Sequence, residues 1–424
     1  MIIRICKIPF AIVILASITP FIAAYTDSKL VALMADLILI ISAIILAASG
    51  KLKLNMSFMP IVLLLILLIH SVLSIIDGRG IGSGGIILFF IELFLFYKML
   101  NVNPLKVNLS DIYKWISWIY IMHLIFLVFE LLARTAGFTD FFVNIAGSST
   151  VTSIYKTYNT AGLLFIYFKM SGLNSLLLGS QSASQLALFG SVWFLSFYTL
   201  ERKQFKLSKL LILVIIFITM YVLSSTMTSN VLMLLIFMLF ILFFNDLKLF
   251  IIKKWPFIFF IMIIFGNWIF EAIFFRINNE EDILIYLSII ESVLETLSKN
   301  ISLYELIVGW GRVSLEGILS LSDFGIGALV IQIGLLMFVF LLWPIIYFVK
   351  NIFSIRKILN SCHPSSRLAF MATINGILGI AWLASLIHYT PAIELGGRQI
   401  FAFHIALTLL LLHKLKSPIL SATV

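Results

Sequence analysis

The residues best suited to chemistry are cations in segments that hold few other positive charges. They are Arg134, Lys156, Lys169, Arg276, Arg312 and Arg398. An arginine guanidinium presents two parallel N–H donors that fit a phosphate, whereas a lysine ammonium is a compact point charge. We therefore expect these cations to bind a phosphate or pyrophosphate group. The alternative is that each anchors the chain at a membrane interface or pairs with a nearby acid such as Glu280, Glu316 or Glu394.

Two further segments hold residues that are suited to acid or base chemistry. His388, Glu394 and Arg398 are crowded into one short segment, where an acid/base group and a phosphate-binding cation could meet. Asp323 begins an apolar stretch. The alternatives are that His388 is a solvated surface residue and that Asp323 is an acid favoured by the dipole at a helix start.

Ionisable residues also occur inside apolar stretches. They are Asp36, Glu92, Glu271, His70 and His123. Burial of an ionisable group in a membrane costs free energy, so such residues are candidates for proton or ion sites, Asp36 first among them. The alternative is that each pairs with a polar group on a neighbouring helix or extends to the interface.

Common cofactor motifs are missing from the chain. Residues 80–85 fit the pattern G-x-G-x-x-G, but no strand precedes them and they lie between two apolar blocks, so we interpret them as a turn. No P-loop, H-E-x-x-H, C-x-x-C or EF-hand pattern occurs. We expect neither a cofactor nor a metal ion.

The composition indicates which elements must position these residues. The chain is 62% hydrophobic and only 11% charged, and its mean hydropathy is +1.15. Its apolar blocks approach the roughly 20 residues that a helix needs to cross a bilayer. Lipid satisfies no backbone hydrogen bonds and the blocks do not alternate in polarity, which excludes open sheets and barrels. The sequence predicts an all-α, polytopic membrane helix bundle.

Hydropathy predicts about twelve transmembrane helices in a single domain, 1–424. The first resembles a secretory signal, and we interpret it as an uncleaved span. The predicted spans are 8–25, 30–48, 59–76, 85–100, 114–132, 182–199, 208–224, 230–245, 256–275, 323–348, 368–387 and 399–413.

The distribution of basic residues predicts the orientation. With the N-terminus inside, 20 of the 29 Lys and Arg residues lie on the inner face, as the positive-inside rule requires. The other nine are Lys29, Arg79, Arg134, Lys156, Lys169, Arg276, Lys299, Arg312 and Arg398. Both termini are then cytoplasmic, and so are Cys6 and Cys362, which we expect to stay reduced. The basic residues are spread over all inner loops, so the net charge does not indicate nucleic-acid binding.

Two outside loops, 133–181 and 276–322, are much longer than the others. The second opens with Asn279 and three acids, followed by leucines and isoleucines at helical spacing, which predicts an amphipathic surface helix. Ser302 and Glu305 then form a capping box, so a second short helix should follow.

Three short motifs accompany this architecture. They are residues 179–185 before the sixth predicted span, residues 306–311, and residues 322–325 before a long span containing Gly334. The whole chain resembles the bacterial O-antigen and capsular polysaccharide polymerase family, whose members have some twelve spans and two enlarged periplasmic loops in the corresponding places. The related O-antigen ligases share this architecture.

The resemblance implies a glycosyltransferase of the bacterial inner membrane that needs neither nucleotide nor metal. It would join undecaprenyl-pyrophosphate-linked oligosaccharide units into O-antigen of lipopolysaccharide, or into capsule, at the periplasmic face. A flippase, a chain-length regulator and membrane lipids are the implied partners. Arg276, Arg312 and Arg398 would stabilise the departing pyrophosphate, with His388 or Asp323 as the base. Arg134, Lys156, Lys169, Tyr155 and Tyr158 would bind substrate.

Other functions stay open at this point. A ligase would move finished glycan to lipid A core and shares this architecture. A polysaccharide flippase or other multi-span transporter would hold paired charges near the midplane and would have short loops on both faces. A membrane scaffold would tolerate replacement of the outside arginines.

The charge distribution yields a test of topology. Reporter fusions near residues 150 and 300 should report the periplasm, and those near 205 and 358 the cytoplasm, because 20 of the 29 basic residues lie on the predicted inner face. Paired alkaline phosphatase and green fluorescent protein fusions measure this. A cytoplasmic signal at 300 would contradict the predicted topology.

Overall fold

The computed structural model describes five continuous stretches of the chain, one short helix and a set of single positions. These are residues 7–26, 28–52, 84–102, 109–138, 303–308 and 397–416, with scattered positions within 65–76, 190–193, 334–351 and 371–379 and at 291. Every element in this part of the chain is a helix, and none is a strand. The fold class is therefore all-α wherever the structure describes it.

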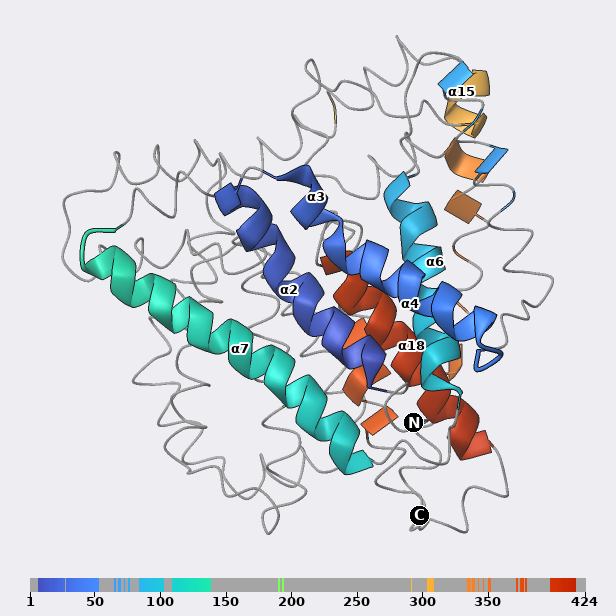
Figure 1. Cartoon of the computed structure of the whole chain (residues 1–424). Coiled ribbons are helices and arrows are strands. Elements are labelled where there is room, and N and C mark those ends of the chain that lie inside the picture. Colours follow the sequence, from blue (N-terminus) through green and yellow to red (C-terminus); the bar gives the residue numbers. More distant parts are fainter. Residues whose placement is uncertain are drawn as a thin grey trace, which may run out of the picture.

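Seven helices have defined bounds (Figure 1). They are α2 (Ile8–Thr26), α3 (Lys29–Ala32), α4 (Met34–Ala48), α6 (Gly84–Leu100), α7 (Leu109–Thr135), α15 (Leu303–Val308) and α18 (Gly397–Lys416).

The helices lie where hydropathy places predicted spans. The spans 8–25, 85–100, 114–132 and 399–413 match α2, α6, α7 and α18, and 30–48 is divided between α3 and α4. Helices α7 and α18 exceed the predicted spans at both ends, because hydropathy marks only the apolar part of a helix that continues into polar residues. Both are long and apolar enough to cross a membrane.

The remaining predicted elements are described unevenly. Helix α15 begins directly after Ser302, which confirms the short helix predicted from the capping box. The spans 59–76, 182–199, 323–348 and 368–387 contain isolated helical positions. The spans 208–224, 230–245 and 256–275, the loop 133–181 and most of the loop 276–322 lie outside the described residues.

Two helices end at glycines in the left-handed region. Gly50 has φ 69° after α4, and its N–H donates to the carbonyl of Ala47. Gly137 has φ 101° after α7, followed by a hydrogen bond from the N–H of Phe138 to the carbonyl of Ala133. These bonds satisfy carbonyls that a helix end leaves without a partner, so both stops are encoded locally.

Helix α2 continues through a proline. Pro20 has no N–H to offer the carbonyl of Ala16 one turn earlier. The hydroxyl of the buried Thr19 donates to that carbonyl at 3.2 Å. A polar side chain beside the proline thus replaces the lost backbone bond.

The core forms where α18 packs against α6 and α2 (Figure 1). Phe403 of α18 meets Phe10 of α2 and Phe96 of α6, with ring centroids 5.0 and 5.8 Å apart. Two residues earlier, Phe401 stacks on Phe89 of α6 at 4.9 Å. These rings join three helices that are far apart in sequence.

Helices α2 and α7 run in the same direction. Phe10 pairs with Trp115, and Phe21 pairs with Phe126, so the contacts advance together along both helices. Figure 1 shows both helices rising from the same side of the molecule. The predicted topology, in which these helices are the first and fifth spans, expects the same direction for both.

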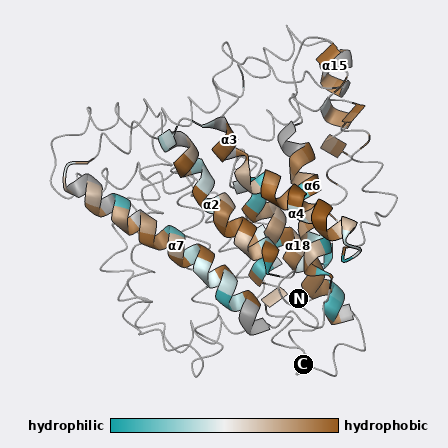
Figure 2. Ribbon diagram, viewed as in Figure 1, coloured by the Kyte–Doolittle hydropathy of each residue, from teal (hydrophilic) through white to brown (hydrophobic). Residues whose placement is uncertain are grey.

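Large apolar side chains remain exposed on the outer faces of the bundle. On α4 they are Leu37, Ile41, Ile44 and Ile45, and on α7 they include Trp118, Ile125, Phe129 and Leu132. Figure 2 shows this hydrophobic colouring along most of the helices. Soluble monomers seldom expose such continuous apolar faces, and lipid-facing helices regularly do.

The ring cluster yields a test of the core. Phe403→Ala should destabilise the protein by about 3 to 5 kcal/mol, because it opens a cavity between α2, α6 and α18. Phe138→Ala is the matched control, since Phe138 is 63% exposed and Phe403 only 1%. Thermal unfolding of the purified protein in detergent measures both. Equal shifts for the two variants would contradict the packing.

Candidate functional site

The first turn of α18 carries a buried ion-pair cluster, here called the Arg398 cluster: Arg398, Gln399, Asp36 and Glu92. The Arg398 Nη2 donates to the Asp36 Oδ2 at 2.7 Å, and its Nε donates to the Glu92 Oε1 at 2.8 Å. The Gln399 Nε2 donates to the Asp36 Oδ1 at 2.7 Å. One guanidinium therefore bridges two carboxylates.

Three helices bring this cluster together. Asp36 lies in the first turn of α4, and Glu92 is the central residue of the 17-residue helix α6. The exposed fractions are 4% for Asp36, 2% for Glu92, 5% for Arg398 and 1% for Gln399. The charges are thus held inside the helix packing, where ion pairs are weakly screened and unpaired charges are costly.

The Arg398 cluster has an excess of acid. Two ionised carboxylates and one guanidinium give a net charge of −1. The Glu92 Oε2 is buried and has no hydrogen-bond partner in the part of the chain that the structure describes. A single proton on the Glu92 Oε2 would neutralise the cluster and would turn this oxygen into a hydrogen-bond donor.

Further along α18 lies a neutral polar network, here called the His404 network: His404, Thr408, Asn375 and Tyr120. The Asn375 Nδ2 donates to the His404 carbonyl and to the Thr408 Oγ1, each at 2.7 Å. Its Oδ1 then faces the His404 Nδ1 at 2.6 Å and can only accept, so Nδ1 carries the proton. The Nε2 is left to accept from the Tyr120 hydroxyl at 2.9 Å. All four residues are buried.

Polar and aromatic contacts extend the network along α7. The Trp193 Nε1 donates to the Ser117 Oγ at 3.1 Å, and the Trp193 ring stacks on Tyr113 at 5.7 Å. A Cβ atom added at Gly190 would lie 3.2 Å from the Tyr120 Cβ, so a glycine allows the close approach. Gly190 and Trp193 therefore pack on the same side of α7 that supplies Tyr120.

Arg398 was predicted in an outside loop as a phosphate-binding residue. The structure places it within α18, bonded to Asp36 and Glu92. For Asp36 and Glu92 the structure shows the pairing alternative, and their partner comes from a third helix. His123 is buried in α7.

The other predicted site residues are not brought together by the described structure. Arg134 lies in the last turn of α7. Those outside the described residues are His388, Asp323, Arg312, Arg276, Lys156, Lys169, Tyr155 and Tyr158.

The His404 network was missed in the sequence. Asn375 and His404 stand inside the predicted spans 368–387 and 399–413, so the rule that singled out Asp36 applies to them also. Their partners, Tyr120 and Thr408, carry no such signal. Among the described residues, no three His, Cys, Asp or Glu side chains are grouped to hold a metal ion.

The Arg398 cluster yields a stability test. Arg398→Ala should cost about 3 to 5 kcal/mol, because two buried carboxylates lose their cation. A triple variant, Asp36→Leu, Glu92→Leu and Arg398→Met, should recover most of the loss, since apolar groups of similar size replace the charges. Thermal unfolding in detergent measures both. A wild-type midpoint for Arg398→Ala would contradict the buried pairing.

Comparison with known proteins adds no relative to this description: no family model, no curated protein and no solved structure matches the chain.

Proposed function

We propose that the chain is a twelve-span inner-membrane polymerase that joins undecaprenyl-pyrophosphate-linked oligosaccharide units into O-antigen or capsular polysaccharide. The resemblance of the sequence motifs and of the loop pattern supports this function. Helices α7 and α18, with their length and apolar composition, support a membrane location. The two long outside loops would hold the substrate sugars at the periplasmic face.

The observation that carries the proposal is the contact of Arg398 with two carboxylates. Transfer of a glycan breaks the bond between the anomeric carbon and the pyrophosphate oxygen, and the electron pair leaves with the pyrophosphate. The acceptor hydroxyl oxygen bonds to the anomeric carbon, and its proton passes to a base. The reaction requires a cation that stabilises the departing pyrophosphate and a base that takes the acceptor proton. The Arg398 cluster supplies a cation, held within 2.8 Å of two carboxylates.

Arg398 has a defined relation to the predicted outer face. It lies in the first turn of α18, directly after the loop that contains His388 and Glu394. Its Nε and Nη2 are occupied by Glu92 and Asp36. A pyrophosphate oxygen would bind Nη1, or would replace one carboxylate as substrate arrives. In this proposal Arg276 and Arg312 complete the pyrophosphate site, and His388 or Asp323 accepts the proton.

The same cluster favours a second candidate function, transport. Paired charges inside apolar helices are typical of proton relays and substrate pathways in transporters. The proton-accepting capacity of the Arg398 cluster would serve a carrier that couples glycan-lipid export to proton entry. A ligase would use the polymerase chemistry with lipid A core as the acceptor.

Deletion of the gene separates these functions. A polymerase mutant should display surface glycan with a single repeat unit, because flipping and ligation continue without chain growth. Gel analysis measures the chain length of the surface glycan. Labelling of the lipid-linked units at the outer face shows whether they have crossed the membrane. Accumulation of the units only on the inner face would favour transport, and surface core without any repeat unit would favour the ligase.

Complementation of the deletion tests the arginines. Arg276→Lys and Arg312→Lys should lower turnover roughly ten- to hundredfold per molecule, because lysine cannot reproduce the two parallel donors that grip a pyrophosphate. Lys299→Arg serves as the control on the same loop. Turnover is normalised to protein level in the membrane. Near-wild-type turnover for both lysine variants would remove the pyrophosphate clamp from the proposal.

A further inference from the structure

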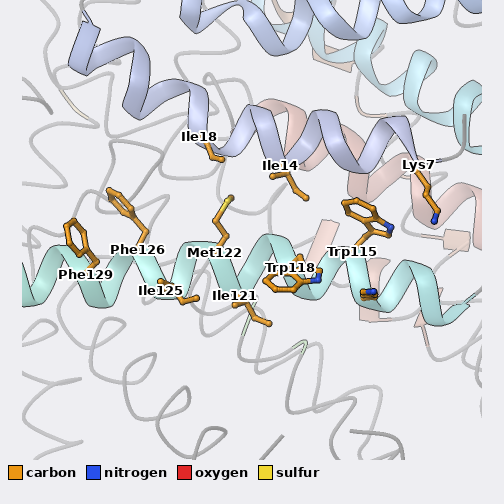
Figure 3. Close-up of a pocket in the computed structure, with 11 residues that line it drawn as sticks. Lys7, Ile14, Ile18, Trp115, Trp118, Ile121, Met122, Ile125, Phe126 and Phe129 are labelled. Atoms are coloured by element: carbon orange, nitrogen blue, oxygen red, sulfur yellow. The ribbon is translucent and has the colours of Figure 1, made fainter. Parts of the chain in front are cut away.

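An apolar groove of about 980 Å³ lies between α2 and α7 (Figure 3). Helix α2 contributes isoleucines to its walls, and α7 contributes isoleucines, a methionine and the aromatic side chains. They include Ile14 and Ile18 on α2 and Trp118, Ile121 and Met122 on α7.

The groove differs at its two ends. At one end lie Lys7 and Lys114, both exposed, beside Trp115. At the other end lie Phe126 and Phe129, and Figure 3 shows the labelled side chains in this order. Among the described residues that line the groove, none is Asp or Glu. The charge of this described lining is therefore positive at one end only, and the rest of it is apolar.

The length and polarity match a membrane lipid. From Lys114 to Phe129 the helix rises about 22 Å at 1.5 Å per residue. This exceeds the roughly 15 Å depth of the hydrocarbon core in one leaflet. Tryptophan favours the level of the lipid headgroups, and lysine attracts anionic headgroups there. A lipid with its headgroup at the lysines would lay an acyl chain over Trp118, Ile121 and Ile125.

We infer that the groove between α2 and α7 binds an anionic phospholipid of the leaflet that faces the start of both helices, with the headgroup phosphate on Lys7 and Lys114. The positive-inside pattern makes this the cytoplasmic leaflet. The inference rests on the membrane location of the two helices and does not use the polymerase chemistry. The bound lipid is distinct from any substrate handled at the periplasmic face.

Native mass spectrometry of the detergent-purified protein tests the inference. Titration with dioleoylphosphatidylglycerol or dioleoylphosphatidylethanolamine gives the affinity for each lipid. The wild type should prefer the glycerol lipid, and Lys7→Gln with Lys114→Gln should reduce that preference about thirtyfold. The control, Lys51→Gln with Lys350→Gln, removes the same charge from exposed lysines outside the groove and should keep the preference.

A second variant tests the apolar part of the groove. Ile121→Trp fills it while both lysines remain, and it should abolish tight binding of either lipid without unfolding, since Ile121 is only half-buried. Equal affinities for the two lipids in the wild type would overturn the inference. So would an equal loss in the control pair, or a dimer of the wild type that Ile121→Trp dissociates, because the groove would then bind a second copy of the chain.

Discussion

The bridge from Arg398 to Asp36 and Glu92 is the interaction on which the described structure depends. It joins the start of α4, the centre of α6 and the first turn of α18, three helices that share no sequence neighbourhood. Apolar surface holds helices together only weakly within lipid, because the lipid tails are as apolar as the side chains. A buried guanidinium that needs both carboxylates selects one arrangement of the three helices and penalises every other.

Helix α18 carries further specific contacts beyond the Arg398 cluster. The Arg398 cluster occupies its first turn, the rings of Phe401 and Phe403 fill the next, and His404 and Thr408 continue the buried side toward α7 and residues 374–376. Charge, aromatic and neutral polar contacts therefore follow one another along a single helix. Because most of its surface is buried, α18 is the centre of the described packing and not a lipid-facing span.

Local features of the sequence predicted the helices well. Apolar blocks placed α2, α6, α7 and α18 within a few residues, and the capping box at Ser302 placed α15. These signals depend on neighbours within one or two turns. The partner of Asp36 and Glu92 lies more than 300 residues away, and no local pattern in a single sequence indicates that these residues are in contact. Arg398 was therefore assigned to the loop beside it, although its partners lie on two other helices.

Helix α7 has two contact sides that cannot be told apart from the hydropathy of its sequence. Tyr113, Ser117 and Tyr120 recur at helical spacing and pack against Trp193 and His404. The opposite side carries Trp118, Met122, Ile125 and Phe129 and forms the groove with α2.

Both sides of α7 are rich in large aromatic or apolar residues, so hydropathy does not separate them. Only the hydroxyl groups and the position of each ring distinguish one side from the other. A lipid chain on the groove side and the His404 network on the other would thus contact the same rigid helix. A shift of α7 as a rigid body that widened or closed the groove would also change the 2.9 Å contact between the Tyr120 hydroxyl and the His404 Nε2.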